Sequence, residues 1–484
     1  MTAGVQVALA RRTVTPFGLW VFGSQASAPV VVLVGGIPAI YATTGVTALP
    51  LTYVLVAAAV ALLAVGYTAM ARQVGHPAAY YGILARGLGR GWGVAGGFVA
   101  LVAYNAIGIS LYGLLGATVA AHLGGVWWVW AGIALAAVGA FGRAPIVRST
   151  VVLSAVLVVS LLIVAAFVLA ALGQPPAGGV SWDGFDASGL LVGGLGGAVA
   201  FCVASVMGVD ASGSFVEEAV DRRSVGRATI GGVLVLGGVY AVAAWAMGVA
   251  VGPAFVGETA AADGDLPFTI LGRVGGWLVV VAGVTLLFGI GSSKLSFHSV
   301  IARYVFAMAR EGVLPAGLAG AEGGARVSAP RGGSLTQTVI AAVVVAGFAA
   351  AGADPIGQMF TWLSTLGAMG LLCLLLAASL AALRAPAEVQ GERAGVWEWK
   401  VAPALGLLAG AAVLAAMVFN VGSLLGAAPG SVAPLLLPAI IIAAAVIGGM
   451  WAGHLRQSRP EVYAAIGHGT PQPNAVPDAI NVSI

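Results

Sequence analysis

The chain has 484 residues, of which 60% are apolar and only 8% are charged, and its formal net charge is +4 at pH 7. Such a composition excludes a water-soluble domain and indicates an integral membrane protein. Membrane topology accounts for the basic excess, so we expect no nucleic-acid partner. Cys202 and Cys373 fall within apolar segments, which favours two small buried side chains over a disulfide or a metal site.

Apolar segments of about 20 residues follow one another along nearly the whole chain, and each could cross a hydrocarbon core of about 30 Å as a helix. We therefore predict an all-α integral membrane protein with twelve transmembrane helices. The expected spans are 17–47, 51–71, 92–121, 126–141, 149–172, 190–216, 227–252, 274–308, 334–351, 357–383, 402–422 and 432–453.

The basic residues lie on one side of this predicted topology. All 21 Lys and Arg residues except Arg273 and Lys294 fall at the side of the membrane that carries the N-terminus. Because cytoplasmic loops are rich in Lys and Arg, we expect both termini to be cytoplasmic. Residues 1–16 then form a cytoplasmic segment, and residues 457–484, rich in Pro, Gly and Asn, form a tail that we expect to be disordered.

Two of the predicted spans contain glycine-rich interruptions. In the first, Gly35, Gly36 and Ile37 precede Pro38 at mid-membrane, and in the sixth several glycines, Gly208 among them, surround Asp210. Spans one and six are five apart, as in carriers built from two inverted five-helix repeats whose first helices break at the midplane. We therefore expect repeats at 17–172 and 190–383, followed by two further helices at 402–453. The alternative is close packing through small residues.

A few polar residues inside the predicted spans are candidates for function. An intramembrane carboxylate or ammonium is costly and usually faces a cavity or pathway, which singles out Asp210 and Lys294. The alternatives are that Asp210 lies in the cytoplasmic vestibule and that Lys294 snorkels or pairs with Asp210. His298 could titrate or make a structural hydrogen bond. Tyr104 and Asn105 in span three could face a substrate path, and Asn105 is favoured because an amide in lipid must find partners.

The acidic pair Glu217 and Glu218 follows span six directly. We expect these carboxylates to pair at the membrane interface with the neighbouring Arg222 and Arg223.

Together these stretches resemble the amino acid–polyamine–organocation permeases over roughly residues 17–456. The most specific element is the run from Ala302 to Pro315, which is similar to the family's motif closing helix eight. Gly208-Val209-Asp210 resembles its Gly-Phe-Glu signature in helix six, with Asp in place of Glu. Phe297-His298 and the run around Tyr104 resemble a bacterial subgroup.

The resemblance implies a leucine-transporter-like carrier of amino acids or related amines. It implies that backbone groups of the broken helices bind the substrate, which maps to Gly35, Gly36, Ile37, Val206, Met207 and Gly208, with Asn105 added from span three. It also implies a gating or proton-linked role for Asp210. The family's basic residue in helix five has no counterpart here, so Lys294 is the candidate substitute for coupling, with Ser296 and His298 beside it.

We therefore expect a secondary transporter in a bacterial plasma membrane, driven by a proton or sodium gradient or by exchange. The alternative is a permease of the same fold for a polyamine, organic cation or nucleobase-like solute. A membrane enzyme is disfavoured because the sequence shows no cluster of His, Asp, Glu or Ser at one membrane face, and ATP drive is disfavoured because it lacks a P-loop. No cofactor is expected.

Overall fold

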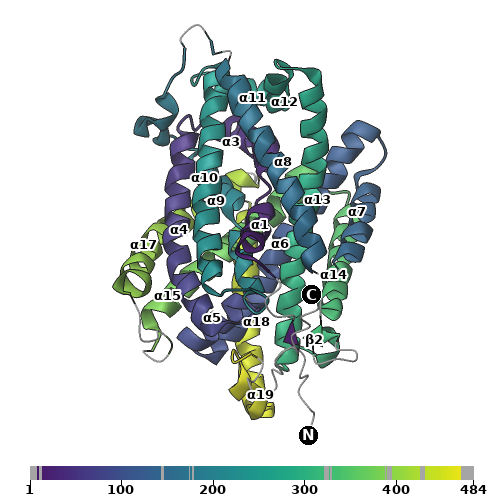
Figure 1. The fold of residues 1–484 in the computed structure, drawn as a ribbon, viewed down its shortest axis with the longest axis vertical. Helices are drawn as coiled ribbons and strands as arrows, with labels where there is room; N and C mark the ends of the chain where they lie inside the picture. Colours follow the sequence, from purple (N-terminus) through teal and green to yellow (C-terminus); the bar gives the residue numbers. More distant parts are fainter. Residues whose placement is uncertain are drawn as a thin grey trace, which may run out of the picture.

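The structure is a computed structural model that describes residues 8–9, 14–142, 146–173, 175–176, 179–320, 326–327, 330–386, 389, 395–425 and 431–469. It is a bundle of long helices with short helices capping both ends (Figure 1). Two-residue strands, β1 (Ala8–Leu9) and β2 (Arg326–Val327), pair in parallel.

The helices of the first half of the chain are α1 (Pro16–Ala26), α2 (Pro29–Val31), η1 (Val32–Gly36), α3 (Ile37–Thr44), α4 (Leu49–Val74), α5 (Ala79–Gly87), α6 (Arg90–Leu123), α7 (Trp127–Phe141), α8 (Ile146–Gly173), η2 (Asp183–Phe185), η3 (Ala187–Leu190), α9 (Leu195–Val206) and η4 (Val209–Phe215). Those of the second half are α10 (Arg223–Val251), α11 (Val256–Ala262), α12 (Leu266–Gly272), α13 (Gly276–Arg310), η5 (Ala316–Ala319), α14 (Arg331–Ala350), η6 (Pro355–Phe360), α15 (Thr361–Arg384), η7 (Trp397–Val401), α17 (Ala402–Leu424), α18 (Ala433–Ser458) and α19 (Pro460–Ala465).

Among the described residues, 11 helical segments are long and apolar enough to cross a membrane. Each overlaps one of the expected spans. The fourth expected span corresponds to α7, which has only 15 residues. The chain is thus a multi-pass membrane protein whose regular secondary structure, among the described residues, is helical apart from the two short strands, and the predicted count of twelve spans is not confirmed.

The helix α6 lies at the centre of the packing and contacts α5, α7, α13, α15 and α18. Small residues permit these close crossings. A Cβ atom on Gly367 of α15, for example, would lie 2.6 Å from the carbonyl oxygen of Ala103 in α6. In Figure 1, α5 and α19 lie at the lower end of the bundle and α11 and α12 at the upper end. We call the lower end, where α1 begins, the N-terminal face.

The first helix breaks between α1 and α2, at Ser27 and Ala28, and not at the predicted Gly35–Pro38. Ala28 has a φ of 44°, and Pro29 follows it. Proline disfavours a helical conformation in the residue before it, which explains the position of the break. At Pro38 the helix continues, because the π-helical turn η1 shifts the hydrogen-bonding register so that the N–H of Ile37 donates to the carbonyl of Val32.

The sixth expected helix breaks inside the region that the sequence indicated. α9 ends at Val206, Met207 is extended, and Gly208 has a φ of 101° before the 3₁₀ helix η4 begins. A Cβ atom on Gly208 would lie 2.8 Å from the Cβ of Ala26 and 2.9 Å from the Cζ of Phe297. The sixth helix therefore turns where it packs tightly against the end of α1.

The C-terminal tail is more ordered than predicted. α18 continues to Ser458, and α19 together with residues 466–469 follows it. Residues 470–484 of the expected disordered tail lie outside the described residues, as do residues 1–7 and 10–13 of the N-terminal segment.

Replacing Gly208 with Ala should destabilise the protein by roughly 1–3 kcal/mol, because the new side chain would be strained at a positive φ and would clash with α1. Thermal unfolding of the purified protein measures this effect. Gly231→Ala in α10 is the matched control, since a Cβ atom there meets nothing within 4 Å. Equal melting temperatures for the two variants would contradict the account of this break.

Candidate functional site

A cavity of about 860 Å³ lies between the second half of the first helix, α6, α9, α13 and the start of α15. It runs from the two helix breaks toward the face opposite the N-terminal face, where Thr44, Gly194 and Gly264 line it. Its lining side chains with hydrogen-bonding groups are all neutral: Ser27, Thr43, Thr44, Ser110, Ser205, Ser293, Thr361, Ser364 and Asn420. Apolar side chains supply most of the remaining wall, including Val31, Val32, Val34, Ile107, Leu111, Phe201, Phe297 and Phe360.

The two helix breaks meet at the inner end of this cavity. The hydroxyl of Ser27 donates to the carbonyl of Met207 across 3.4 Å. The hydroxyl of Ser293 donates to the carbonyl of Ala26 at 2.6 Å, and Tyr240 donates to the carbonyl of Ser27 at 3.2 Å. Side-chain hydroxyls thus satisfy carbonyl groups that the first break removes from the regular helical pattern.

At each break, the C-terminal end of one helix and the N-terminal end of the next lie in the middle of the bundle. The C-terminal ends of α1 and α9 carry partial negative charge, whereas the residues that start helix again at Pro29 and Val209 carry partial positive charge. Ser27, Ala28 and Met207 bring both helix breaks to the cavity, whose walls carry no ionised side chain among the described residues.

The structure separates the predicted substrate-binding residues into two groups. Gly35, Gly36 and Met207 line the cavity, whereas Ile37, Val206 and Gly208 are adjacent to lining residues but do not line it themselves. Asn105 also lies outside the cavity. Its amide nitrogen donates to the carbonyl of Leu101, one turn earlier in the same helix, at 2.8 Å.

Asp210 lies on the N-terminal side of the break and is only 4% exposed. Its Oδ2 accepts hydrogen bonds from the hydroxyls of Tyr80 (2.8 Å) and Tyr104 (2.5 Å), and its Oδ1 accepts from the N–H of Gly208 at 3.1 Å. Tyr67 donates to its backbone carbonyl at 2.9 Å. We call Asp210, Tyr67, Tyr80 and Tyr104 the floor, because they close the bundle beneath the cavity.

Sequence reasoning considered only Tyr104 among these tyrosines. Tyr80 belongs to α5, a short helix outside every predicted span, so nothing in the sequence pattern placed it near Asp210. A buried carboxylate must find hydrogen-bond donors. The 10 tyrosines of the chain were therefore candidate donors that the sequence offered for Asp210.

Lys294 is buried and does not reach Asp210. Its Nζ lies 4.7 Å from the ring centroid of Tyr112 and makes no hydrogen bond to any described residue. The described ion pairs also include none between Lys294 and Asp210. The alternative in which the two residues pair therefore does not hold in this conformation.

Ser296 and His298 connect α13 to neighbouring helices. The hydroxyl of Ser296 donates to the carbonyl of Phe22 in α1 at 2.7 Å. His298 bonds through Nε2 to the hydroxyl of Ser334 at 2.7 Å and through Nδ1 to Oε1 of Gln337 at 2.5 Å, both in α14. Neither residue lines the cavity.

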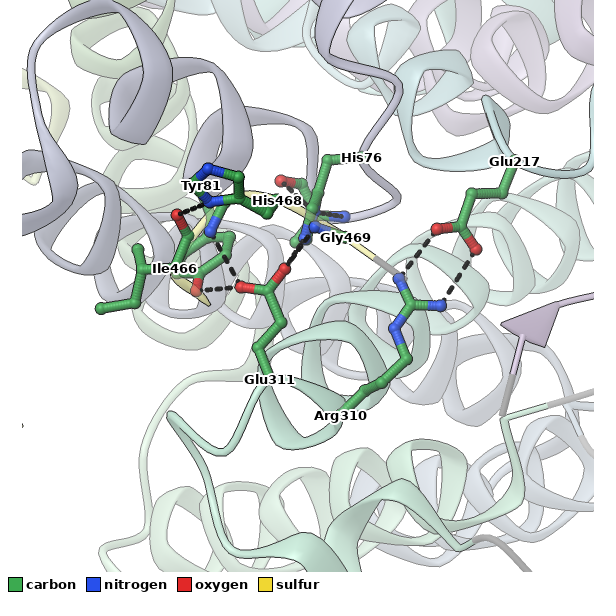
Figure 2. Close-up of polar contacts among 10 residues, drawn as sticks. His76, Tyr81, Glu217, Arg310, Glu311, Ile466, His468 and Gly469 are labelled. Carbon is green, nitrogen blue, oxygen red and sulfur yellow. Dashed lines mark hydrogen bonds and ion pairs between the residues drawn. The ribbon is translucent and has the colours of Figure 1, made fainter. Parts of the chain in front are cut away.

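Two ion pairs tie the end of η4 to α13 near the N-terminal face. Glu218 accepts two hydrogen bonds from Arg303, at 2.6 and 3.0 Å, and Glu217 accepts two from Arg310, at 2.8 and 3.2 Å. Figure 2 shows the second pair. The expected pairing with Arg222 and Arg223 is wrong. Each carboxylate instead forms a bidentate pair with an arginine of α13, which is 85 residues away in the sequence for Glu218 and 93 residues away for Glu217.

No family model matches the sequence, and no curated protein matches it. Among solved structures, the chain is similar to a mutant form of a manganese transporter from Eremococcus coleocola, with a TM-score of 0.56 and 17% identity. The similarity covers 92% of this chain and 98% of that one. The chain therefore has the fold of a membrane transporter, in agreement with the predicted leucine-transporter-like architecture. Membership of the amino acid–polyamine–organocation family does not follow from this similarity.

Removing one partner of the Arg303–Glu218 pair should destabilise the protein by about 3–5 kcal/mol, because the other charge is left buried and unpaired. Arg303→Met should therefore lower the melting temperature strongly. The double variant Arg303→Met/Glu218→Leu should recover much of the loss, since no charge is then buried. A double variant less stable than the single one would contradict this.

Proposed function

We propose that the protein is a secondary active transporter that moves an amino acid, or a closely related amine, across the cytoplasmic membrane by alternating access. The observation that carries this proposal is the cavity itself. It starts at the two broken helices and extends toward one face of the bundle, and the floor lies on the other side of the break at Gly208. Opening the floor while closing the opposite end would deliver a bound solute to the N-terminal face, which we take to be cytoplasmic.

The chemistry of the cavity favours a small zwitterion. Helix ends with partial positive charge suit a carboxylate, and helix ends with partial negative charge suit an ammonium group. A substrate that carries one charge of each sign needs no ionised side chain for compensation. The apolar wall formed by residues such as Ile107, Phe201 and Phe360 further favours an uncharged, apolar side chain on that substrate.

The two alternatives suit the cavity less well. A polyamine or other organic cation would find no carboxylate among the described lining residues, although a neutral nucleobase-like solute could use the hydroxyls. The structural neighbour is named a manganese transporter, but Mn²⁺ prefers carboxylate, carbonyl and water ligands. No described group of His, Cys, Asp or Glu is arranged to hold a metal ion, so we do not propose manganese as the substrate.

We further propose that Asp210 acts as a gate, with Lys294, Ser296 and His298 as candidates for coupling to a proton or sodium gradient. Asp210 holds the floor closed through two tyrosine hydroxyls, and these bonds must break for the floor to open. Lys294 is buried in α13 without a hydrogen-bonding partner among the described residues, so it is an ionisable group in the bundle interior that a conformational change could pair or hydrate.

The purified protein should bind amino acids with apolar side chains, and the corresponding decarboxylated amines should compete poorly. Gly36→Val should abolish this binding, because the added side chain projects between Val32 and Ser205 at the cavity wall. Binding of a labelled amino acid panel, followed by uptake into proteoliposomes with imposed Na⁺ and pH gradients, measures both effects.

Gly238→Val is the matched control, because a Cβ atom at Gly238 meets nothing within 4 Å. Unchanged affinity in a folded Gly36→Val protein would place the substrate elsewhere. Equal competition by decarboxylated amines would favour the organic-cation alternative.

Asp210→Asn and Lys294→Met should each flatten the pH dependence of uptake, because each removes an ionisable group from the buried interior. Since the two groups make no ion pair in this conformation, we expect the double variant to be no worse than the sum of the two single variants. Wild-type pH profiles in both single variants would make these residues structural.

A further inference from the structure

The chain folds back on itself after α18. The segment formed by α19 and residues 466–469, which we call the C-terminal strap, lies against the N-terminal face and not free of it. Ile466 is 1% exposed. The N–H groups of Gly467 and Gly469 donate to the two carboxylate oxygens of Glu311 at 2.9 and 2.7 Å. Figure 2 labels Gly469 beside Glu311.

Glu311 follows α13 directly, and the same carboxylate also holds the region of α5. The Nε2 of His76 lies 2.9 Å from its Oε1, and the hydroxyl of Tyr81 donates to its Oε2. Because an ionised carboxylate only accepts, His76 must donate through Nε2. Glu311 thus accepts four hydrogen bonds, two from the strap and two from residues at or just before α5.

The strap also fits α5 closely by shape. Gly467 has a φ of 75°, and a Cβ atom there would lie 2.5 Å from the Cβ of Ala85 in α5. Earlier in the strap, within α19, the ring of Tyr463 lies 5.7 Å from the guanidinium carbon of Arg90 at the start of α6. Only glycine allows the strap to approach α5 at this position.

α5 connects this site to the floor. Tyr81, which bonds to Glu311, is adjacent to Tyr80, which bonds to Asp210 at 2.8 Å. The N–H of Tyr80 also donates to the hydroxyl of Tyr304 in α13. A large separation of Tyr80 from Asp210 requires α5 itself to move. The docked strap opposes this movement of α5.

We propose that the C-terminal strap is an intramolecular brake on the transporter. Docked on Glu311, it holds α5 so that the floor stays closed on the N-terminal side of the cavity. Undocked, it frees α5 and allows the floor to open. The strap therefore sets the fraction of molecules whose cavity opens toward the N-terminal face.

Acid within the physiological range does not release this brake. Burial alone would raise the pKa of Glu311, but the imidazole of His76 and hydrogen bonds from His76, Tyr81 and Gly467 lower it to about 2. A depressed pKa stabilises the folded state fully above the unfolded value of about 4.3, and this stabilisation is lost progressively as the pH falls from there through about 2. Other titratable residues described near the contact are Arg310 beside Tyr81, His468 in the strap, and Arg222, whose guanidinium packs against Gly75 next to His76.

Hydrogen exchange of the full-length protein in lipid nanodiscs tests the brake without any solute. Gly467→Val should displace the strap, and a chain ending after Ser458 should lack it. We expect amide exchange in α5 to rise about tenfold in both variants, because α5 then opens at a lower free energy. Gly453→Val in α18 is the matched control, since a Cβ atom there meets nothing within 4 Å.

One expected result rests on the proposed transport function: initial uptake should be faster in both variants. Unchanged exchange of α5 in the chain that ends after Ser458 would overturn the brake and leave the transport proposal intact. An equal rise in exchange in the interiors of α4 and α10 would also overturn it, because the strap would then support the whole fold. Absence of uptake in every protein, with faster α5 exchange, would contradict the transport proposal alone.

Discussion

The whole structure depends on one constraint, which is that a backbone polar group inside a membrane protein must find a partner or line a water-filled space. Both helix breaks expose such groups at mid-bundle. Hydroxyls of Ser293 and Tyr240 satisfy the carbonyls of Ala26 and Ser27 at the first break. Ser27, Ala28 and Met207, which form the two breaks, also line the cavity, so the breaks and the candidate site coincide.

A second consequence of burial appears at the floor. Tyrosine hydroxyls and a backbone N–H compensate Asp210, and none of the ion pairs among the described residues includes it. Hydrogen bonds to neutral hydroxyls can be exchanged for bonds to water more readily than a buried ion pair can be separated. The ion pairs of Arg303 and Arg310 lie farther toward the N-terminal face and join η4 to α13. Under the gating role proposed for Asp210, the contact that must open therefore lies nearer the cavity than the stronger ion pairs.

The sequence predicted much of this fold because apolar length and glycine position have local physical causes. It predicted all 11 long membrane helices of the described chain and the break at Gly208 beside Asp210. It misplaced the first break, because Pro38 after two glycines suggests a stronger interruption than Pro29. Only the π-helical turn before Pro38, which has no clear sequence signal, keeps that stretch helical.

The contacts that the sequence could not predict are those between distant segments. Glu217 and Glu218 pair with α13 and not with the adjacent arginines. Tyr80 and the strap reach their partners through the three-dimensional packing of short helices outside the apolar spans. Charge and hydropathy patterns report the environment of one segment at a time, so they carry no information about these pairings.

Measuring from which side of the membrane a reagent reaches the cavity would distinguish a cavity closed by the floor from one that is not. Ser205 lines the cavity at the end of α9, so a Ser205→Cys variant, with Cys202 and Cys373 replaced by Ala, can be labelled with a membrane-impermeant thiol reagent in oriented vesicles. The account predicts labelling from the face opposite the N-terminal face, and labelling from the N-terminal face once Tyr80→Phe and Tyr104→Phe remove the hydroxyls from Asp210. Labelling from one and the same face in both proteins would contradict it.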